Sequence, residues 1–143
     1  MDWLVTLSHE VVSIMYWIYS SPQLRYIKAV HGFRDENITI LMDDGDHIPP
    51  TRHNIMAAYR KIVGESEAGD AIFLHYSGHG GTVKDTSGDE ASGYDETLVP
   101  VDYLENGMII DDDLHEIIVN RMPEGVVCFS LVCYLLSLNR RFV

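Results

Sequence analysis

An apolar run from Asp70 to Tyr76 leads directly into a glycine-rich segment, Ser77-Gly78-His79-Gly80-Gly81. A near-continuous apolar run is typical of a central strand that is covered on both faces, because neither face meets water. Such strands occur in parallel sheets whose connecting helices lie on both sides. This segment therefore restricts the chain to an α/β fold, with a loop at the carboxyl end of the central strand.

The rest of the chain alternates between strand and helix patterns. Besides the central strand, we predict a helix over 10–19, a buried strand over 38–42, an amphipathic helix from an N-cap at Thr51 to Gly64, an extended piece over 97–101 with Pro100 at an edge or strand end, a helix over 111–119 and a buried strand over 126–132. This alternation predicts a mostly parallel sheet flanked by helices on both sides. A chain of 143 residues is long enough for one such domain and too short for two.

Acidic residues dominate the charge of the chain. The formal net charge of −12 would repel a phosphate backbone, so we expect no nucleic-acid partner. Ten carboxylates fall between Asp85 and Asp113, where there is no Lys or Arg. Such a cluster is typical of a cation site or of a solvated face, and the pattern alone leaves both open.

The two cysteines, Cys128 and Cys133, lie in an apolar run and match neither a disulfide framework nor a zinc motif. We expect both to be buried core thiols of a cytoplasmic protein. The N-terminus has no basic segment before its apolar residues, which argues against a signal peptide. The apolar stretch over 126–138 is shorter than the roughly 20 residues that span a bilayer, so no membrane partner is expected.

His79 is the residue of the glycine-rich loop that can carry chemistry. Functional groups gather in loops at the carboxyl ends of strands, because these loops share one rim of an open α/β sheet. A histidine there can act as general base toward a cysteine and as general acid toward a leaving amine, since imidazole exchanges a proton near neutral pH. The same histidine could instead cap a turn, and one histidine with three glycines does not decide between the two roles.

Further motifs follow in a fixed order along the chain. They are Asp43-Asp44, Pro50-Thr51-Arg52, Gly93-Tyr94-Asp95-Glu96-Thr97-Leu98, Pro100-Val101-Asp102-Tyr103 and Ile109-Ile110-Asp111-Asp112-Asp113. Together with the His79 loop, this set resembles the catalytic domain of metacaspases over residues 31–125. The resemblance implies a caspase-like fold and a relationship to calcium-dependent cysteine endopeptidases of peptidase family C14, which cleave protein or peptide substrates after Arg or Lys. The segments outside 31–125 depart from the family pattern, so we expect residues 1–143 to form a single partial, truncated domain.

The resemblance also implies roles for individual residues. His79 matches the catalytic histidine, and Ser77 matches a residue that lines the pocket for the basic side chain of the substrate. Asp95, Asp111 and Asp112 match carboxylates that hold an activating calcium ion, which agrees with the preference of calcium for several oxygen ligands. Alternatively, Asp111 and Asp112 only begin a helix, where carboxylates interact favourably with the helix dipole.

The nucleophilic cysteine of the family has no clear match. By ungapped spacing from His79 it falls at Leu135. Cys133 is the remaining candidate, but along a strand it is displaced from that position by roughly 6 to 7 Å, too far for a histidine that is held in place. We therefore predict an inactive member of the family, able at most to bind calcium or to associate with full-length members through its sheet. The alternatives are an active endopeptidase that uses Cys133 and an unrelated acidic, calcium-binding α/β module.

Overall fold

The structure, a computed structural model, describes residues 9–15, 22–86, 88 and 91–134. Its elements follow in the order β1 (His9–Met15), α1 (Pro22–His31), a 3-10 turn (Asp35–Asn37), β2 (Ile38–Leu41), α2 (Arg52–Glu65), β3 (Ala71–Gly78), β4 (Gly80–Lys84), β5 (Tyr94–Leu98), α3 (Tyr103–Asn106), β6 (Ile109–Ile110), α4 (Asp111–Leu114), the π-helical segment η2 (His115–Val119) and β7 (Val127–Tyr134). Among the described helices, none is long and apolar enough to cross a membrane.

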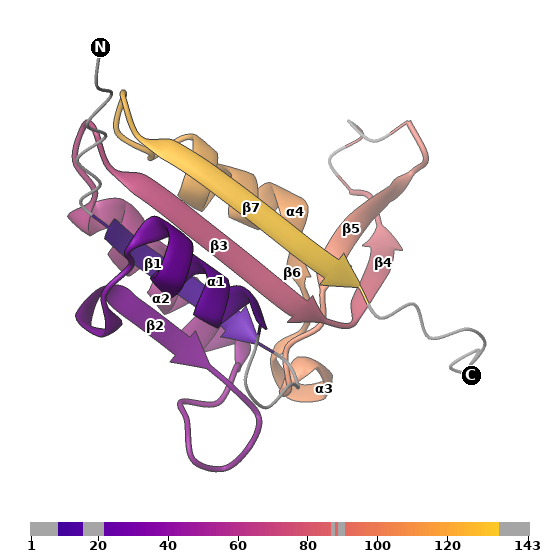
Figure 1. The fold of residues 1–143 in the computed structure, drawn as a ribbon. Helices are drawn as coiled ribbons and strands as arrows, with labels where there is room; N and C mark the ends of the chain where they lie inside the picture. Colours follow the sequence, from indigo (N-terminus) through magenta and orange to yellow (C-terminus); the bar gives the residue numbers. More distant parts are fainter. Residues whose placement is uncertain (1–8, 16–21, 87, 89–90, 135–143) are drawn as a thin grey trace.

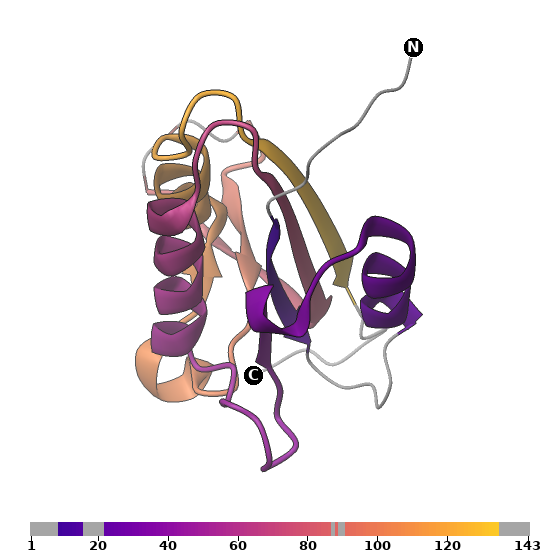
Figure 2. The same ribbon diagram turned by 60° about the vertical axis from the view of Figure 1, so that its left-hand side comes forward.

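Four parallel strands form the main sheet, in the order β2, β1, β3, β7 (Figure 1). The run predicted to be central is β3, which lies between β1 and β7. Helix α1 covers one face of the sheet, and α2 and α4 cover the other, as Figure 2 shows. The predicted α/β fold, a parallel sheet with helices on both sides, is therefore confirmed.

The main core lies between β3 and α2. On β3, the side chains of Ile72, Leu74 and Tyr76 are buried on the same face, because successive side chains of a strand point to opposite sides. Helix α2 contributes the buried residues Ile55, Met56, Ala58, Tyr59, Ile62 and Val63. Ile117 of η2 belongs to the same cluster, so the helical face of the sheet is one continuous core.

The predicted N-cap of α2 is confirmed. The Thr51 Oγ1 atom accepts a hydrogen bond from the Asn54 N–H at 3.2 Å, which satisfies a backbone donor that the first helical turn leaves without a partner. The helix ends at Glu65, one residue after the predicted Gly64. The predicted helix over 111–119 is also present, as α4 followed by η2.

The prediction of a helix over 10–19 is wrong. His9–Met15 is strand β1, which pairs in parallel with β2 on one side and β3 on the other; positions 16–19 lie outside the described residues. Its residues mix polar and apolar side chains without strict alternation, so periodicity missed it. The helix of this region is α1, which begins at Pro22, a position where a proline is tolerated.

The segment after β3 also differs from the prediction. The expected glycine-rich loop is reduced to His79, because β3 ends at Gly78 and β4 begins at Gly80. Strands β4, β5 and β6 form a second, antiparallel sheet. The extended piece predicted over 97–101 is β5, Tyr94–Leu98, which ends before Pro100.

Strand β7 was predicted to be buried, and this is wrong. It is the last strand in the order of the parallel sheet, and Val127 and Phe129 are 52% and 62% exposed. Its apolar composition matches that of a central strand, whereas its position is that of an edge (Figure 1). The strand predicted over 38–42, β2, lies at the opposite edge, and of its residues only Leu41 is buried.

Candidate active site

His79 lies where the chain leaves the parallel sheet and enters the antiparallel one, at the carboxyl end of β3. Its side chain is exposed. Its backbone carbonyl accepts two hydrogen bonds, from the Val99 N–H at 3.0 Å and from the Tyr76 hydroxyl at 2.9 Å. The imidazole is thus open to solvent, while the backbone that carries it is fastened to the core.

Ser77, the predicted pocket residue, is half-buried and lies near the end of β3. It pairs in register with Cys133 of β7, and the next pair, Gly78 with Tyr134, is the last of the ladder. Cys133 is therefore level with Ser77, two residues before His79. At about 3.3 Å per residue along a strand, this corresponds to roughly 6 to 7 Å. Leu135, the position predicted from spacing for the nucleophile, lies outside the described residues.

Cys128 lies toward the opposite end of β7, where it pairs with Ile72. The prediction that it is a buried core thiol is wrong, because β7 is an edge strand and Cys128 is exposed. It lines a cavity of about 630 Å³ together with Leu74, His115 and Ile118. Although the residue is exposed as a whole, the thiol itself is partly shielded, and this desolvation raises the pKa of Cys128. Such a thiol is mostly protonated near neutral pH and is a poor nucleophile.

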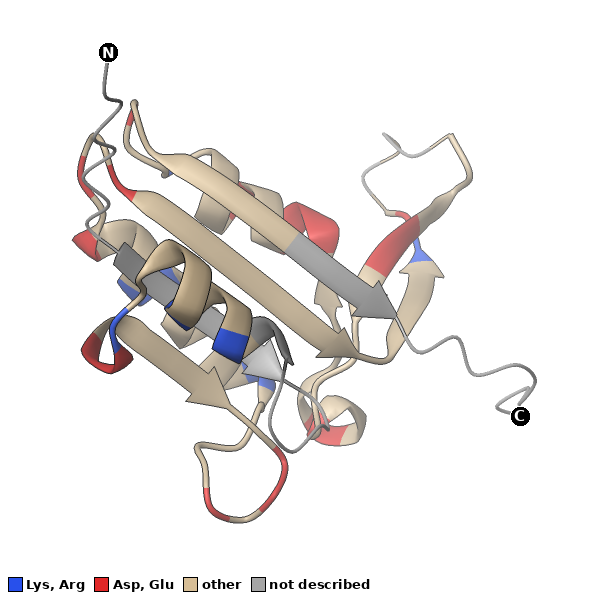
Figure 3. Cartoon of the chain, viewed as in Figure 1, with Lys and Arg blue, Asp and Glu red and all other residues tan. Residues whose placement is uncertain are grey.

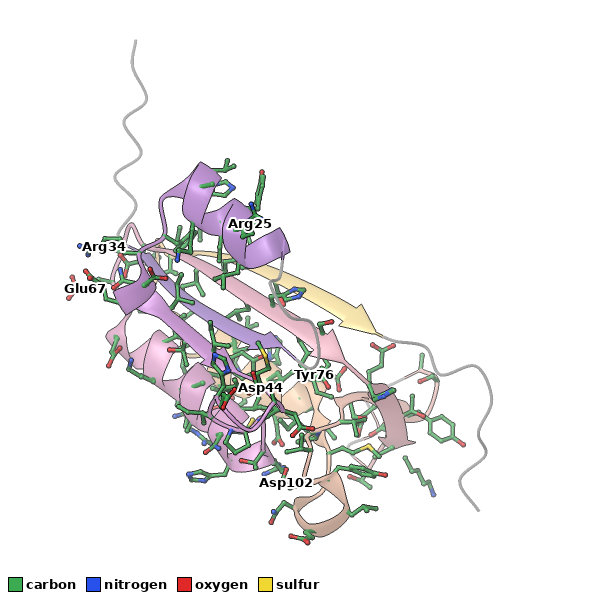
Figure 4. The ribbon with its side chains drawn as sticks, turned by 60° about the horizontal axis from the view of Figure 1, so that its bottom comes forward. Arg25, Arg34, Asp44, Glu67, Tyr76 and Asp102 are labelled. Carbon is green, nitrogen blue, oxygen red and sulfur yellow. The ribbon has the colours of Figure 1, made fainter. Side chains whose placement is uncertain are left out.

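Arg52, at the start of α2, contacts three other parts of the chain. Its backbone N–H donates to the Asp102 carboxylate at 2.8 Å, and its guanidinium donates to the Met108 carbonyl at 3.3 Å. The guanidinium also forms an ion pair with Asp113 at 2.8 Å. Figure 4 shows Asp102 beside α3, near the start of α2. Arg52 therefore links the start of α2 to the loop after β5 and to the first turn of α4, a role that the sequence pattern did not reveal.

The predicted calcium ligands lie on neighbouring elements. Strand β5 pairs with β6 through Thr97 and Ile110. Asp95 comes two residues before Thr97, and Asp111 and Asp112 directly follow Ile110. Figure 3 shows acidic residues on β5 and at the start of α4 close together. Asp95 is 5% exposed, whereas Asp111 and Asp112 are exposed. The carboxylate donors suit calcium, but no set of three or more acidic, His or Cys side chains within the described ranges is arranged to hold a metal. Calcium binding therefore stays a prediction.

Gly81, two residues after His79, lies where there is little room for a side chain. A Cβ atom at this position would lie 3.1 Å from Thr97 Oγ1 and 3.3 Å from Met108 Sδ. At this position, strand β4 therefore approaches β5 and Met108 too closely for a side chain to fit without a shift of its neighbours. Gly81 thus contributes to close packing between β4 and β5.

Residues 23–134 match the family model described as the metacaspase, peptidase C14 domain. The chain is 59% identical over 114 residues to Metacaspase III c of Phaeodactylum tricornutum, a match that covers 78% of this chain and 34% of that protein. It is 48% identical over 96 residues to Metacaspase-1 of Mycosarcoma maydis, covering 66% of this chain and 24% of the relative. The chain thus spans about a third and about a quarter of the length of these relatives.

A solved structure supports the fold. The crystal structure of a Geobacter sulfurreducens protein superimposes with a TM-score of 0.62 at 29% sequence identity, covering 87% of this chain and 50% of the other. The parallel sheet with helices on both faces agrees with the caspase-like arrangement expected from the sequence.

Proposed function

We propose a function for this chain from the family to which it belongs, the metacaspases of peptidase family C14. The chain supplies one half of a caspase-like active site, with His79 as the general base and Ser77 in the pocket for a basic substrate side chain. It does not hydrolyse peptide bonds by itself. The observation that carries this proposal is the β3–β7 register, which puts Cys133 level with Ser77 and not with His79.

The chemistry explains why this register matters. In a cysteine peptidase the histidine takes the proton of the thiol, the thiolate attacks the scissile carbonyl, and the histidine then gives the proton to the leaving amine. Proton transfer needs the thiol and the imidazole within about 3 Å of each other. The offset of roughly 6 to 7 Å along the strand exceeds that distance, and His79 is restrained by two hydrogen bonds to its carbonyl. Cys133 is thus a poor partner for His79.

Hydrolysis of a fluorogenic peptide with Arg or Lys before the cleaved bond tests the proposal. We expect no turnover by the unmodified chain, with or without millimolar calcium, and no difference from Cys133→Ala or His79→Ala. Calcium-dependent turnover that both substitutions abolish would instead establish an active endopeptidase that uses Cys133.

We further propose that Asp95, Asp111 and Asp112 hold calcium. The pairing of β5 with β6, which brings their backbones together, supports this proposal. If calcium is bound, it supplies positive charge that offsets the repulsion between these carboxylates and holds β5 against α4.

Isothermal titration calorimetry with calcium chloride checks this second proposal. We expect binding with a Kd on the order of 10⁻⁴ to 10⁻³ M and a loss of about tenfold or more in Asp95→Asn, because a carboxylate ligand is replaced by a weaker amide. Glu105→Gln is the control, since Glu105 is an exposed acid on the neighbouring α3. No heat at millimolar calcium would leave Asp111 and Asp112 as the acidic first turn of a helix.

The edge of β7 suggests a partner. We propose that this edge associates with another chain of the same family, because Val127 and Phe129 leave apolar surface exposed beside strand β3. If the chain or such an assembly is active, proteins and peptides are its substrates.

A cytoplasmic location also remains a proposal, supported by the two cysteines and their lack of a disulfide pattern.

A further inference from the structure

We propose that the hydroxyl of Tyr76 is a positioning group for His79, acting through the backbone carbonyl of the histidine. The proposal rests on the proposed role of His79 as general base and deepens it. The His79 side chain is exposed, and its placement depends in part on the backbone that carries it. Tyr76 lies three residues before His79 and reaches that backbone directly.

The contacts of the hydroxyl are specific. Tyr76 is 2% exposed, and its oxygen lies 2.9 Å from the His79 carbonyl oxygen. The same oxygen is 3.3 Å from the Val99 carbonyl oxygen and 3.3 Å from the Val99 nitrogen. A phenol has one proton, so it donates over the shorter distance to His79 and accepts from the Val99 N–H. The Val99 N–H is shared, because it also donates to the His79 carbonyl at 3.0 Å. The hydroxyl thus joins the histidine to the loop after β5.

The hydrogen bond from Tyr76 to the His79 carbonyl lies at a point where the chain passes from one sheet to the other. His79 is the single residue between two sheets, and the residues beside it, Gly78 and Gly80, have no side chains that could pack and restrain it. Figure 4 shows Tyr76 near the end of β3. The two hydrogen bonds to its carbonyl therefore restrain the backbone of His79 at this point.

The loop that holds Val99 is itself anchored to α2. The Val101 N–H donates to the Pro50 carbonyl at 3.2 Å, and the Asp102 carboxylate accepts the Arg52 N–H at 2.8 Å. A rigid loop makes the bond to Tyr76 effective, because the hydroxyl then ties His79 to a fixed part of the core.

Nuclear magnetic resonance of the full chain tests the proposal with Tyr76→Phe, which removes the hydroxyl and keeps the ring. Tyr59→Phe is the matched control, since Tyr59 is an equally buried tyrosine of the same core on α2. In Tyr76→Phe we expect the Val99 amide to exchange with solvent about tenfold faster and the His79 ring signals to move and broaden. Amides in the middle of β3 should keep their rates, and Tyr59→Phe should leave Val99 and His79 unchanged.

Two results would overturn the proposal. One is a Tyr76→Phe variant whose Val99 exchange and His79 signals match those of the unmodified chain. The other is equal acceleration of all amides in both variants, which indicates a contribution to overall stability alone. Neither readout depends on peptide hydrolysis, so the proposal can fail or succeed whichever way the activity assay turns out.

Discussion

Replacing Ile62 with alanine is expected to lower the free energy of unfolding by about 2 to 5 kcal/mol. Ile62 is 1% exposed and belongs to the cluster between α2, β3 and η2. Alanine removes apolar contact and leaves a cavity, because neighbours on a sheet and a helix can close only part of the space. A domain of this size is stabilised by about 5 to 15 kcal/mol in total, so the loss is a large part of its stability.

Urea denaturation followed by circular dichroism measures this loss. Lys61→Ala is the control on the adjacent position of the same helix, where the Lys61–Glu65 pair is exposed and spans 3.5 Å. That variant is expected to change stability by less than about 0.5 kcal/mol. Equal effects of the two substitutions would mean that α2 does not pack on the sheet as described.

Phe129→Lys is expected to reduce self-association of the chain several-fold at the same protein concentration. Phe129 is 62% exposed on β7, and there is no charged residue between Val127 and Tyr134. An edge strand that is apolar and uncharged can pair with the edge of another molecule, and lysine is a common means of preventing this. The unmodified chain should therefore be poorly soluble when expressed alone.

Size-exclusion chromatography with light scattering, over a range of concentrations, measures the effect. Leu104→Lys is the control, because Leu104 is 84% exposed on α3, away from the edge of the parallel sheet. If both substitutions improve solubility equally, the added surface charge is responsible, and self-association does not occur specifically through the edge of β7. A monomeric, soluble unmodified chain at high concentration would contradict the prediction outright.

Some elements were predictable because their own residues carry the pattern that identifies them. The apolar run of β3 and the capped, amphipathic pattern of α2 report burial and helical period directly, and both are present. Strand β1 was missed because it contains both polar and apolar residues while pairing on both sides. Strand β7 was assigned the wrong environment because its sequence suits a central strand, whereas its place in the sheet depends on what lies beside it.

The site was predictable only in part for a similar reason. The motif identified His79, but the Tyr76 hydroxyl also contacts Val99, 23 positions away, and the Arg52 guanidinium contacts Asp113, 61 positions away. Such contacts leave no local pattern. The register of β3 with β7, which sets Cys133 level with Ser77, is likewise a property of the sheet and not of a local motif.

Labelling with an arginine-containing peptidyl acyloxymethyl ketone tests the central claim most directly, because this reagent reacts with a thiolate that is activated beside a bound basic side chain. The chain at millimolar calcium is expected to show no adduct by intact mass, as are His79→Ala and Cys133→Ala. A stoichiometric adduct on Cys133 that disappears in His79→Ala would contradict the claim that His79 has no aligned nucleophile.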